Sequence, residues 1–190
     1  MKNELRIIGG TWRSRKIRFP DAPGLRPTPD RVRETLFNWL GQDLEGLSCL
    51  DLYAGSGALG FEAASRGAAR VVQVEGGAQA CLALRQNCAL LDALAVEVAQ
   101  TDVSRFLAGP AEPFDIVFLD PPFHQGLVGP CCRALEGRGW LAAHARIYIE
   151  VERGLALEDL PENWQVLRGR QAGEVAYQIY QRKPPGQMNL

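Results

Sequence analysis

Short apolar runs alternate with segments of helical periodicity through the middle of the chain. Buried strands are predicted at 48–53, 70–75, 95–99, 114–119 and 146–151, and helices between them at 58–67, 78–91, 103–108 and 126–138. Strands that alternate with helices of this length form right-handed βαβ units. The pattern therefore predicts an α/β fold with a mostly parallel, doubly wound sheet.

The two ends of the chain depart from this alternation. Thr28 and Pro29 are typical of a helix N-cap followed by proline in the first turn, and apolar residues at helical spacing then predict a helix that Gly41 ends. At the other end, extended runs at 164–170 and 174–182 surround a short turn, which predicts an antiparallel β-hairpin.

Residues 184–190 are expected to form a frayed tail. We therefore divide the chain into an N-terminal extension of hairpin and helix, residues 1–42, and a main domain, residues 43–190.

Composition places the chain among soluble globular proteins. With 190 residues, 46% of them hydrophobic and 23% charged, the chain is long enough for a sizeable core, which excludes the disordered and fibrous classes. The first ten residues lack the apolar segment of a signal peptide, and no run of about 18 apolar residues follows. We expect a cytoplasmic protein.

The five cysteines do not form a recognisable chemical motif. Their number is odd, and they make no CxxC pair and no Cys/His cluster with metal-ligand spacing. Cys81 and Cys88 share a helical face with Leu84 and Leu91, which predicts that this face is buried. We therefore expect reduced core cysteines and no metal site.

Charge is distributed unevenly along a chain whose formal net charge is −1. Residues 1–35 hold nine Lys and Arg against four Asp and Glu, a net +5, and the remainder holds twelve against eighteen, a net −6. The candidate contacts to nucleic acid in this basic arm are Trp12, Arg13, Arg15, Lys16, Arg18, Arg26, Arg31 and Arg33. Charge alone leaves two interpretations open, a solvated surface arm and a nucleic-acid footprint.

A glycine-rich loop follows the first strand of the main domain. Gly55, Gly57 and Gly60 satisfy GxGxxG, and Glu75 ends the next strand twenty residues beyond Gly55. In an α/β sheet such a loop lets the backbone approach an adenosine cofactor, and the acidic residue accepts from the ribose hydroxyls. The alternative is a tight turn whose glycines serve packing, but the surrounding strand, helix and strand-end acid favour cofactor binding.

The neighbouring residues bear on which cofactor is bound. A carboxylate at Asp51 favours the cationic S-adenosylmethionine over a pyrophosphate dinucleotide, unless that carboxylate turns away to hydrogen-bond loop amides. Asp102 follows the third strand, where it either accepts from the adenine amino group or caps the short helix 103–108. Tyr53 and Ser56 complete the candidate cofactor-binding set.

A second candidate motif, Asp120-Pro121-Pro122-Phe123, follows the strand 114–119. Ligands of open α/β sheets bind at the carboxyl ends of the strands. The two prolines stiffen the backbone and leave carbonyl acceptors beside Asp120, while Phe123 offers an apolar face. Such acceptors beside a stacking ring suit the exocyclic amine of a flipped-out nucleobase. Taken alone, the motif is better explained by a proline-terminated strand with a core phenylalanine, but together with the glycine loop it favours a site for a base.

These motifs together resemble a known family. The segments 51–60, 101–107 and 117–123, with Glu75, look like motifs of class I S-adenosylmethionine-dependent methyltransferases that modify exocyclic amines. The segments 6–17, 24–40 and 172–182 resemble the bacterial 16S rRNA (guanine-N2) methyltransferase RsmD family over most of the chain. Tyr53 stands where Phe is common in that family, and Gly76 and Gly77 follow the ribose acid where less flexible residues are usual.

The resemblance implies a Rossmann-like fold and methylation of the guanosine customarily numbered 966 in the small-subunit rRNA. As a working mechanism, Asp120 and the Pro121 carbonyl accept the two N–H bonds of guanine N2 while Phe123 stacks on the base. The expected partner is 16S rRNA in a partly assembled small subunit, bound by a monomer. His124 is expected to contact substrate at most, and His144 to lie on the surface.

Three alternatives stay open on the residues alone. A nicotinamide-dependent oxidoreductase shares the glycine loop but leaves Asp120 to Phe123 unexplained. A non-catalytic RNA-binding module uses only the basic arm. A DNA amino-methyltransferase uses a similar proline motif but usually carries a separate target-recognition domain, for which 190 residues leave little room.

Overall fold

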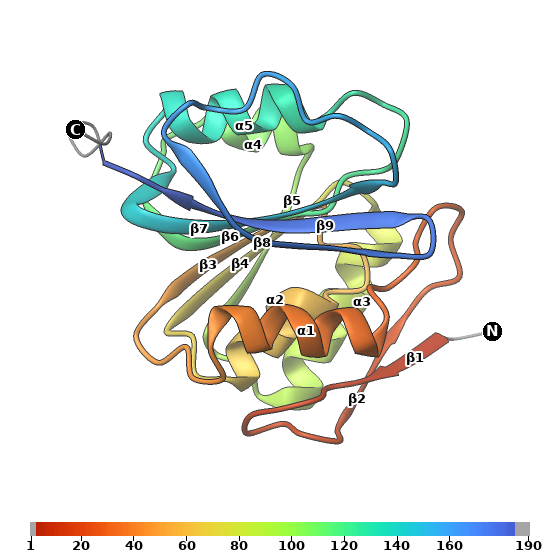
Figure 1. Ribbon diagram of the computed structural model, residues 1–190. Helices are drawn as coiled ribbons and strands as arrows, with labels where there is room; N and C mark the ends of the chain where they lie inside the picture. The colour runs from red at the N-terminus through yellow and green to blue at the C-terminus, as the bar shows by residue number, and fades with distance from the viewer. Residues whose placement is uncertain (1–2, 185–190) are drawn as a thin grey trace. The chain divides into compact units, whose positions relative to one another are not determined.

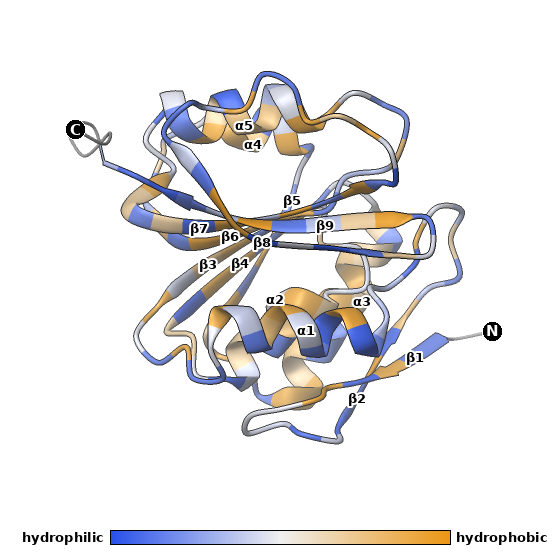
Figure 2. Cartoon of the chain, viewed as in Figure 1, coloured by the Kyte–Doolittle hydropathy of each residue, from blue (hydrophilic) through white to orange (hydrophobic). Residues whose placement is uncertain are grey.

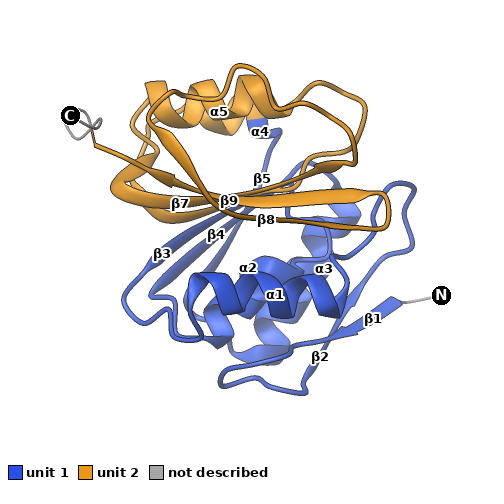
Figure 3. Ribbon diagram, viewed as in Figure 1, with its two compact units in different colours: residues 1–103 blue, residues 104–190 orange. Residues whose placement is uncertain are grey.

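The computed structural model describes residues 3–184, so the tail predicted at 184–190 lies outside the described residues except for Pro184. The chain forms two compact units, Met1–Val103 and Ser104–Leu190 (Figure 3). The first contains β1 (Asn3–Arg6), β2 (Lys16–Phe19), α1 (Asp30–Leu40), β3 (Ser48–Leu52), α2 (Ala58–Ser65), β4 (Arg70–Glu75), α3 (Ala78–Leu91) and β5 (Val96–Gln100) (Figure 1). The second contains β6 (Phe114–Leu119), α5 (Val128–Gly137), β7 (Leu141–Glu152), β8 (Trp164–Ala172) and β9 (Val175–Arg182), and α4 (Val103–Leu107) begins at the boundary.

Two βαβ crossovers build the first unit. β3 pairs with β4, and β4 with β5, all parallel and in the order β5-β4-β3. The apolar helix α2 contacts β3 and β4, and α3 contacts β4 and β5 (Figure 2). The predicted strands and helices of this region are confirmed. α2 stops two residues early, and Gly67 follows with a φ of 97° that a helix does not accept.

The N-terminal extension folds onto α3. β1 and β2 pair antiparallel, and Leu5, Ile17 and Phe19 join Leu84 and Leu91 in one apolar cluster. The side chain of Asn87 bonds both backbone groups of Arg18, at 3.0 and 2.8 Å. α1 begins at Asp30, one residue later than predicted, with Pro29 in place of Thr28 at the N-cap.

The second unit mixes parallel and antiparallel pairing. β6 and β7 are parallel, and Leu119 lies opposite Ile149. β9 lies antiparallel between β7 and β8, which confirms the predicted C-terminal hairpin. β7 begins at Leu141, five residues before the predicted strand, because Leu141 pairs with Phe114 across an irregularity in the ladder.

All five cysteines are free thiols. Cys49, Cys81, Cys131 and Cys132 are buried and Cys88 is half-buried, which confirms the prediction of reduced core residues. Burial raises the pKa of the Cys132 thiol well above its usual value.

Candidate active site

The glycine loop joins β3 to the start of α2. Gly57 has a φ of 78°, and a Cβ there would lie 2.5 Å from Leu84 Cδ2 and 2.7 Å from the Phe61 ring, so the second glycine of the motif is required for packing. Gly55 has a φ of 55°, and a Cβ built there would lie 3.8 Å from its nearest neighbours. The backbone at Gly55 is therefore open to close approach by a ligand.

Glu75 fixes this loop from the end of β4. Its Oε2 accepts from the Gly55 N–H at 2.9 Å, and its Oε1 accepts from the Gly77 N–H at 2.7 Å. Each carboxylate oxygen keeps lone-pair capacity for a further donor. Gly77, one of the two departures from the family pattern, thus holds the acidic side chain in place.

Asp51 and Ser56 point into the protein instead of toward a ligand. The Asp51 carboxylate is buried, and its Oδ2 accepts from the Gly60 N–H at 3.0 Å. Burial raises the pKa of Asp51 to about 7. Ser56 is also buried, with its Oγ accepting from the Ala58 N–H at 3.3 Å. The alternative, a hydrogen bond to a backbone amide, is present, with the amide in α2, and binding of a cationic cofactor by Asp51 stays a prediction.

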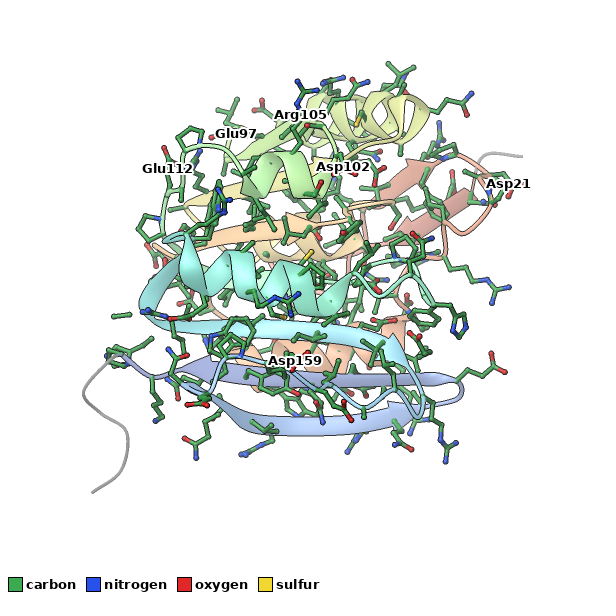
Figure 4. The ribbon with its side chains drawn as sticks, turned by 90° about the horizontal axis from the view of Figure 1, so that it is seen from above. Asp21, Glu97, Asp102, Arg105, Glu112 and Asp159 are labelled. Carbon is green, nitrogen blue, oxygen red and sulfur yellow. The ribbon has the colours of Figure 1, made fainter. Side chains whose placement is uncertain are left out.

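The other two candidate cofactor ligands lie nearer to solvent. Tyr53 is half-buried with a φ of 59°, which ends β3 and turns the chain into the loop. Asp102 is exposed immediately before α4 (Figure 4). Their binding of a cofactor stays a prediction.

The proline motif directly follows the carboxyl end of β6, as the sequence predicts. Asp120 is half-buried, Pro121 is buried, Pro122 is exposed and Phe123 is half-buried. The next residue, His124, has a φ of 61°, an unusual conformation for a residue with a side chain. The surface position predicted for His144 is confirmed, since this residue is exposed.

Glu152, at the end of β7, anchors the loop that follows the motif. Its Oε1 lies 3.2 Å from both the backbone nitrogen and the Nδ1 of His124. Sequence reasoning did not single out Glu152. The available signal was its place at the end of a strand parallel to the one that carries Asp120.

A cavity of about 340 Å³ adjoins the motif within the second unit. Pro121, Pro122 and Glu150 line it, together with the loop after β7 that includes Asp159 (labelled in Figure 4). The Tyr148 hydroxyl donates to Glu150 Oε2 at 2.7 Å. Burial raises the pKa of both Glu150 and Tyr148.

Most cations of the basic arm are exposed, but they differ in their partners. Lys16 and Arg18 both pair with Glu4, at 3.0 Å each, and Arg15 donates to the Leu90 carbonyl at 2.7 Å. The side chains of Arg13, Arg26 and Arg31 make no ion pair or hydrogen bond with any residue in 3–184. These three are therefore available to a partner. Trp12 is half-buried and packs against the apolar cluster under the hairpin.

Arg33 does not belong to that basic surface. Its side chain is 1% exposed and pairs with the fully buried Glu62 at 3.3 Å and with Asp30. It also donates to the carbonyls of Arg6 and Thr28. The prediction that Arg33 contacts RNA is wrong, because this guanidinium joins α1 to the hairpin and to α2.

Comparison with known proteins defines the class. The chain superposes on the putative methyltransferase yhhF of Escherichia coli with a TM-score of 0.87 and 47% identity, over 96% of this chain and 99% of that one. A putative methylase of Haemophilus influenzae gives a TM-score of 0.82 and 41% identity, over 95% and 99%. The fold is that of a Rossmann-like class I methyltransferase, with a mostly parallel sheet and antiparallel C-terminal strands.

The sequence comparisons then define the family. A family model described as conserved hypothetical protein 95 matches residues 5–181. The ribosomal RNA small subunit methyltransferase D of Escherichia coli is 48% identical over 97% of this chain and 93% of its own length, and that of Haemophilus influenzae is 44% identical over 95% of each. The chain belongs to this small subunit methyltransferase D family.

Within residues 3–184, no helix is long and apolar enough to cross a membrane, and no three His, Cys, Asp or Glu side chains are grouped to hold a metal ion.

Proposed function

We propose that this protein transfers a methyl group from S-adenosylmethionine to the exocyclic N2 of a guanosine in 16S rRNA, the one customarily numbered 966. The observation that carries the proposal is the motif Asp120 to Phe123 after β6, in a chain 48% identical to a named rRNA methyltransferase. Pro121 and Pro122 of this motif line a cavity. The family's substrate is a small ribosomal subunit or its assembly intermediate, and we expect a monomer acting in the cytoplasm.

The residues of the glycine loop suit S-adenosylmethionine. The open backbone at Gly55 allows close approach, and Glu75, held by two backbone amides, has lone pairs left for ribose hydroxyls. When bound, this cofactor supplies an activated methyl group on a sulfonium. The loop and Glu75 orient it, while Asp51 acts from inside by fixing the first turn of α2.

The proline motif is assigned to the base. The lone pair of guanine N2 is delocalised into the ring, so the amine is a poor nucleophile until its hydrogens are held out of the ring plane. The Asp120 carboxylate and the Pro121 carbonyl accept the two N–H bonds, and Phe123 stacks on the ring. The cofactor would supply the methyl carbon and leave as S-adenosylhomocysteine, and the Asp120 carboxylate, which accepts an N2–H, would be placed to take the proton that N2 gives up. Orientation of the reactants supplies up to about 7–11 kcal/mol of the barrier reduction.

The basic arm is assigned to the rRNA backbone. Arg13, Arg26 and Arg31 are exposed cations without partners among the described residues, as electrostatic contact with phosphates requires. The net −6 of residues 36–190 disfavours indiscriminate binding by the rest of the chain.

The test is methyl transfer from labelled S-adenosylmethionine to naked 16S rRNA, to small subunits and to DNA, followed by nucleoside analysis. We expect label on guanine N2 of rRNA. Asp120→Ala should nearly abolish turnover and leave cofactor affinity within a few fold, whereas Glu75→Ala should mainly weaken cofactor binding. Asp43→Asn, which removes an exposed carboxylate, is the control and should keep activity.

Three outcomes contradict the proposal. Label on adenine or cytosine overturns the assignment to guanine N2. Full turnover by Asp120→Ala removes Asp120 from the mechanism. Thermal stabilisation by NAD without stabilisation by S-adenosylmethionine indicates an oxidoreductase instead.

A further inference from the structure

Two carboxylates lie at the same level of neighbouring parallel strands in the second unit: Asp120 directly follows β6, and Glu150 lies two residues before the end of β7. Phe118 pairs with Tyr148 and Leu119 with Ile149, so Asp120 follows β6 at the level of Glu150 in β7. Side chains at paired positions of parallel strands point to the same face. Asp120 and Glu150 therefore lie side by side on the same face of these two strands.

Glu150 is buried, and one of its two carboxylate oxygens has a hydrogen-bond donor within residues 3–184. The residue is 6% exposed, and its Oε2 accepts from the Tyr148 hydroxyl at 2.7 Å. Its Oε1 accepts no hydrogen bond from any residue in the described part of the chain, 3–184. This oxygen is not sealed inside the protein, so a donor from a ligand can reach it.

The cavity beside the proline motif gives a ligand access to this oxygen. Glu150 lines it together with Pro121 and Pro122, and its volume of about 340 Å³ falls within the range of small-molecule sites. The lining holds three further carboxylates: Glu152 is already engaged by the backbone and ring of His124, and Glu158 and Asp159 are exposed in the loop after β7. Of these four carboxylates, Glu150 is the buried one, and one of its oxygens has no donor among residues 3–184.

We propose that Glu150 selects guanine by accepting its N1–H, next to the N2 amine that Asp120 and Pro121 hold. This assignment rests on the proposed function. Guanine presents two adjacent donors, N1–H and N2–H, on its Watson–Crick edge, whereas adenine and cytosine place an acceptor ring nitrogen beside their amine. Two neighbouring carboxylates match the two donors of guanine. The Glu150 carboxylate repels the ring-nitrogen lone pair that adenine or cytosine presents at the same place.

Tyr148 is the positioning residue of this arrangement. Its hydroxyl donates to Oε2, which leaves Oε1 as the acceptor for a ligand. With Tyr148 on one oxygen and N1–H on the other, the ionised carboxylate has a donor at each end. The burial that raises the pKa of Glu150 in the free protein also strengthens a hydrogen bond to the base.

The experiment measures kcat/KM for methyl transfer by the full-length protein to two rRNA substrates, one with guanosine and one with 2-aminopurine at the target position. 2-Aminopurine keeps the reactive 2-amino group but has an acceptor at N1. Wild type should prefer guanosine by at least about tenfold in kcat/KM, since a hydrogen bond to a charged group is lost with the analogue. Glu150→Gln replaces the acceptor by an amide that can donate to N1, and should reduce this preference at least about tenfold.

A matched control removes the same charge from the rim of the cavity. Glu158 is an exposed glutamate of the loop after β7, and Glu158→Gln should keep the wild-type preference. Tyr148→Phe, which frees Glu150 without removing its charge, should lower the preference by a smaller factor. Thermal denaturation confirms that each variant is folded.

The outcomes separate the two proposals. If wild type methylates guanosine and Glu150→Gln keeps its preference over 2-aminopurine, the role of Glu150 is overturned while the proposed function stands. An equal fall in kcat/KM for guanosine and for 2-aminopurine in folded Glu150→Gln also overturns this role, since selection requires the ratio of the two values to change. If wild type methylates neither base at N2, the proposed function fails and the assignment of Glu150 fails with it.

Discussion

The carboxylate of Glu62 pairs with the guanidinium of Arg33 at 3.3 Å, and neither side chain is more than 1% exposed. The same carboxylate accepts from the Arg66 guanidinium at 2.8 Å and from the backbone N–H groups of Ile8 and Gly9 at 3.0 and 2.8 Å. Glu62, on α2, therefore holds the N-terminal extension and α1 at one point. Because its two cationic partners are also buried, its charge is difficult to replace.

We expect Glu62→Gln to lower the free energy of unfolding by about 3 kcal/mol or more, because it removes the carboxylate that two buried guanidinium groups share, and only Arg33 keeps another, that of Asp30. Urea denaturation measures the effect. Glu34→Gln, at an exposed position of α1, should stay within about 0.5 kcal/mol of wild type. A loss below 1 kcal/mol in Glu62→Gln would contradict a central role for this carboxylate.

A pair of glycine variants separates backbone strain from steric clash in the cofactor loop. Gly57 and Gly24 have φ values of 78° and 79°, but a Cβ meets Leu84 only at Gly57 and open space at Gly24. Gly24→Ala should cost about 1–2 kcal/mol through backbone strain alone. Gly57→Ala should cost about 1–3 kcal/mol more through overpacking.

Thermal denaturation and calorimetric titration with S-adenosylmethionine measure both glycine variants. Gly57→Ala should also weaken cofactor affinity, because the loop must shift to accommodate the methyl group. Equal losses in the two variants would show that the contact with Leu84 does not constrain the loop.

Asp51 should make stability depend on pH. Burial raises its pKa to about 7 in the folded protein from 3.8 in the reference state, so the folded protein binds this proton more tightly than the unfolded chain does. The contribution of this proton to the free energy of unfolding is complete below about pH 4 and is lost as pH rises to about 7. Asp51→Asn removes this dependence.

The test compares urea denaturation of wild type and Asp51→Asn across this pH range. The variant, which keeps an acceptor for the Gly60 N–H, should gain at least about 1 kcal/mol relative to wild type between pH 4 and pH 8. A constant difference between the two proteins over that range would mean that Asp51 does not titrate there.

Cations of the basic arm should differ in their effect on RNA affinity. Arg13→Gln removes an exposed charge with no partner in the described residues, and should lower the slope of log affinity against log salt by about 1. Lys16→Gln should have a smaller effect, because Glu4 already neutralises part of that charge. Arg138→Gln in the second unit is the control. Identical slopes for all variants would place the phosphate contacts elsewhere.

Local patterns predicted most of the elements but not the direction of buried polar side chains. Hydrophobic periodicity located β4, α3 and β6 at their observed bounds because it depends on neighbouring residues. Whether Arg33 faces water or Glu62 depends on a partner 29 positions away, and Asp51 turns inward to an amide nine positions away. Such choices are made by packing between elements, which the order of residues does not display.

At the candidate base site, too, local sequence patterns reveal neighbours along the chain but not contacts between strands. Asp120 to Phe123 were recognised because prolines and an aromatic ring follow a strand directly. Glu150 was missed because it lies inside a predicted strand and looks like a solvent-facing alternate position. The parallel register of β6 and β7 brings it level with Asp120.

The way the N-terminal segment is fastened bears on protein engineering. Besides the two amides held by Glu62, the Thr11 and Trp12 amides bond the carbonyl and hydroxyl of Ser65, and a Cβ at Gly10 would lie 1.9 Å from that carbonyl. Residues 1–42 are consequently not a portable module: grafted onto another methyltransferase without Glu62 and Ser65, their amides would lose four acceptors. A chimaera that keeps the fold of this arm must carry α2 with it.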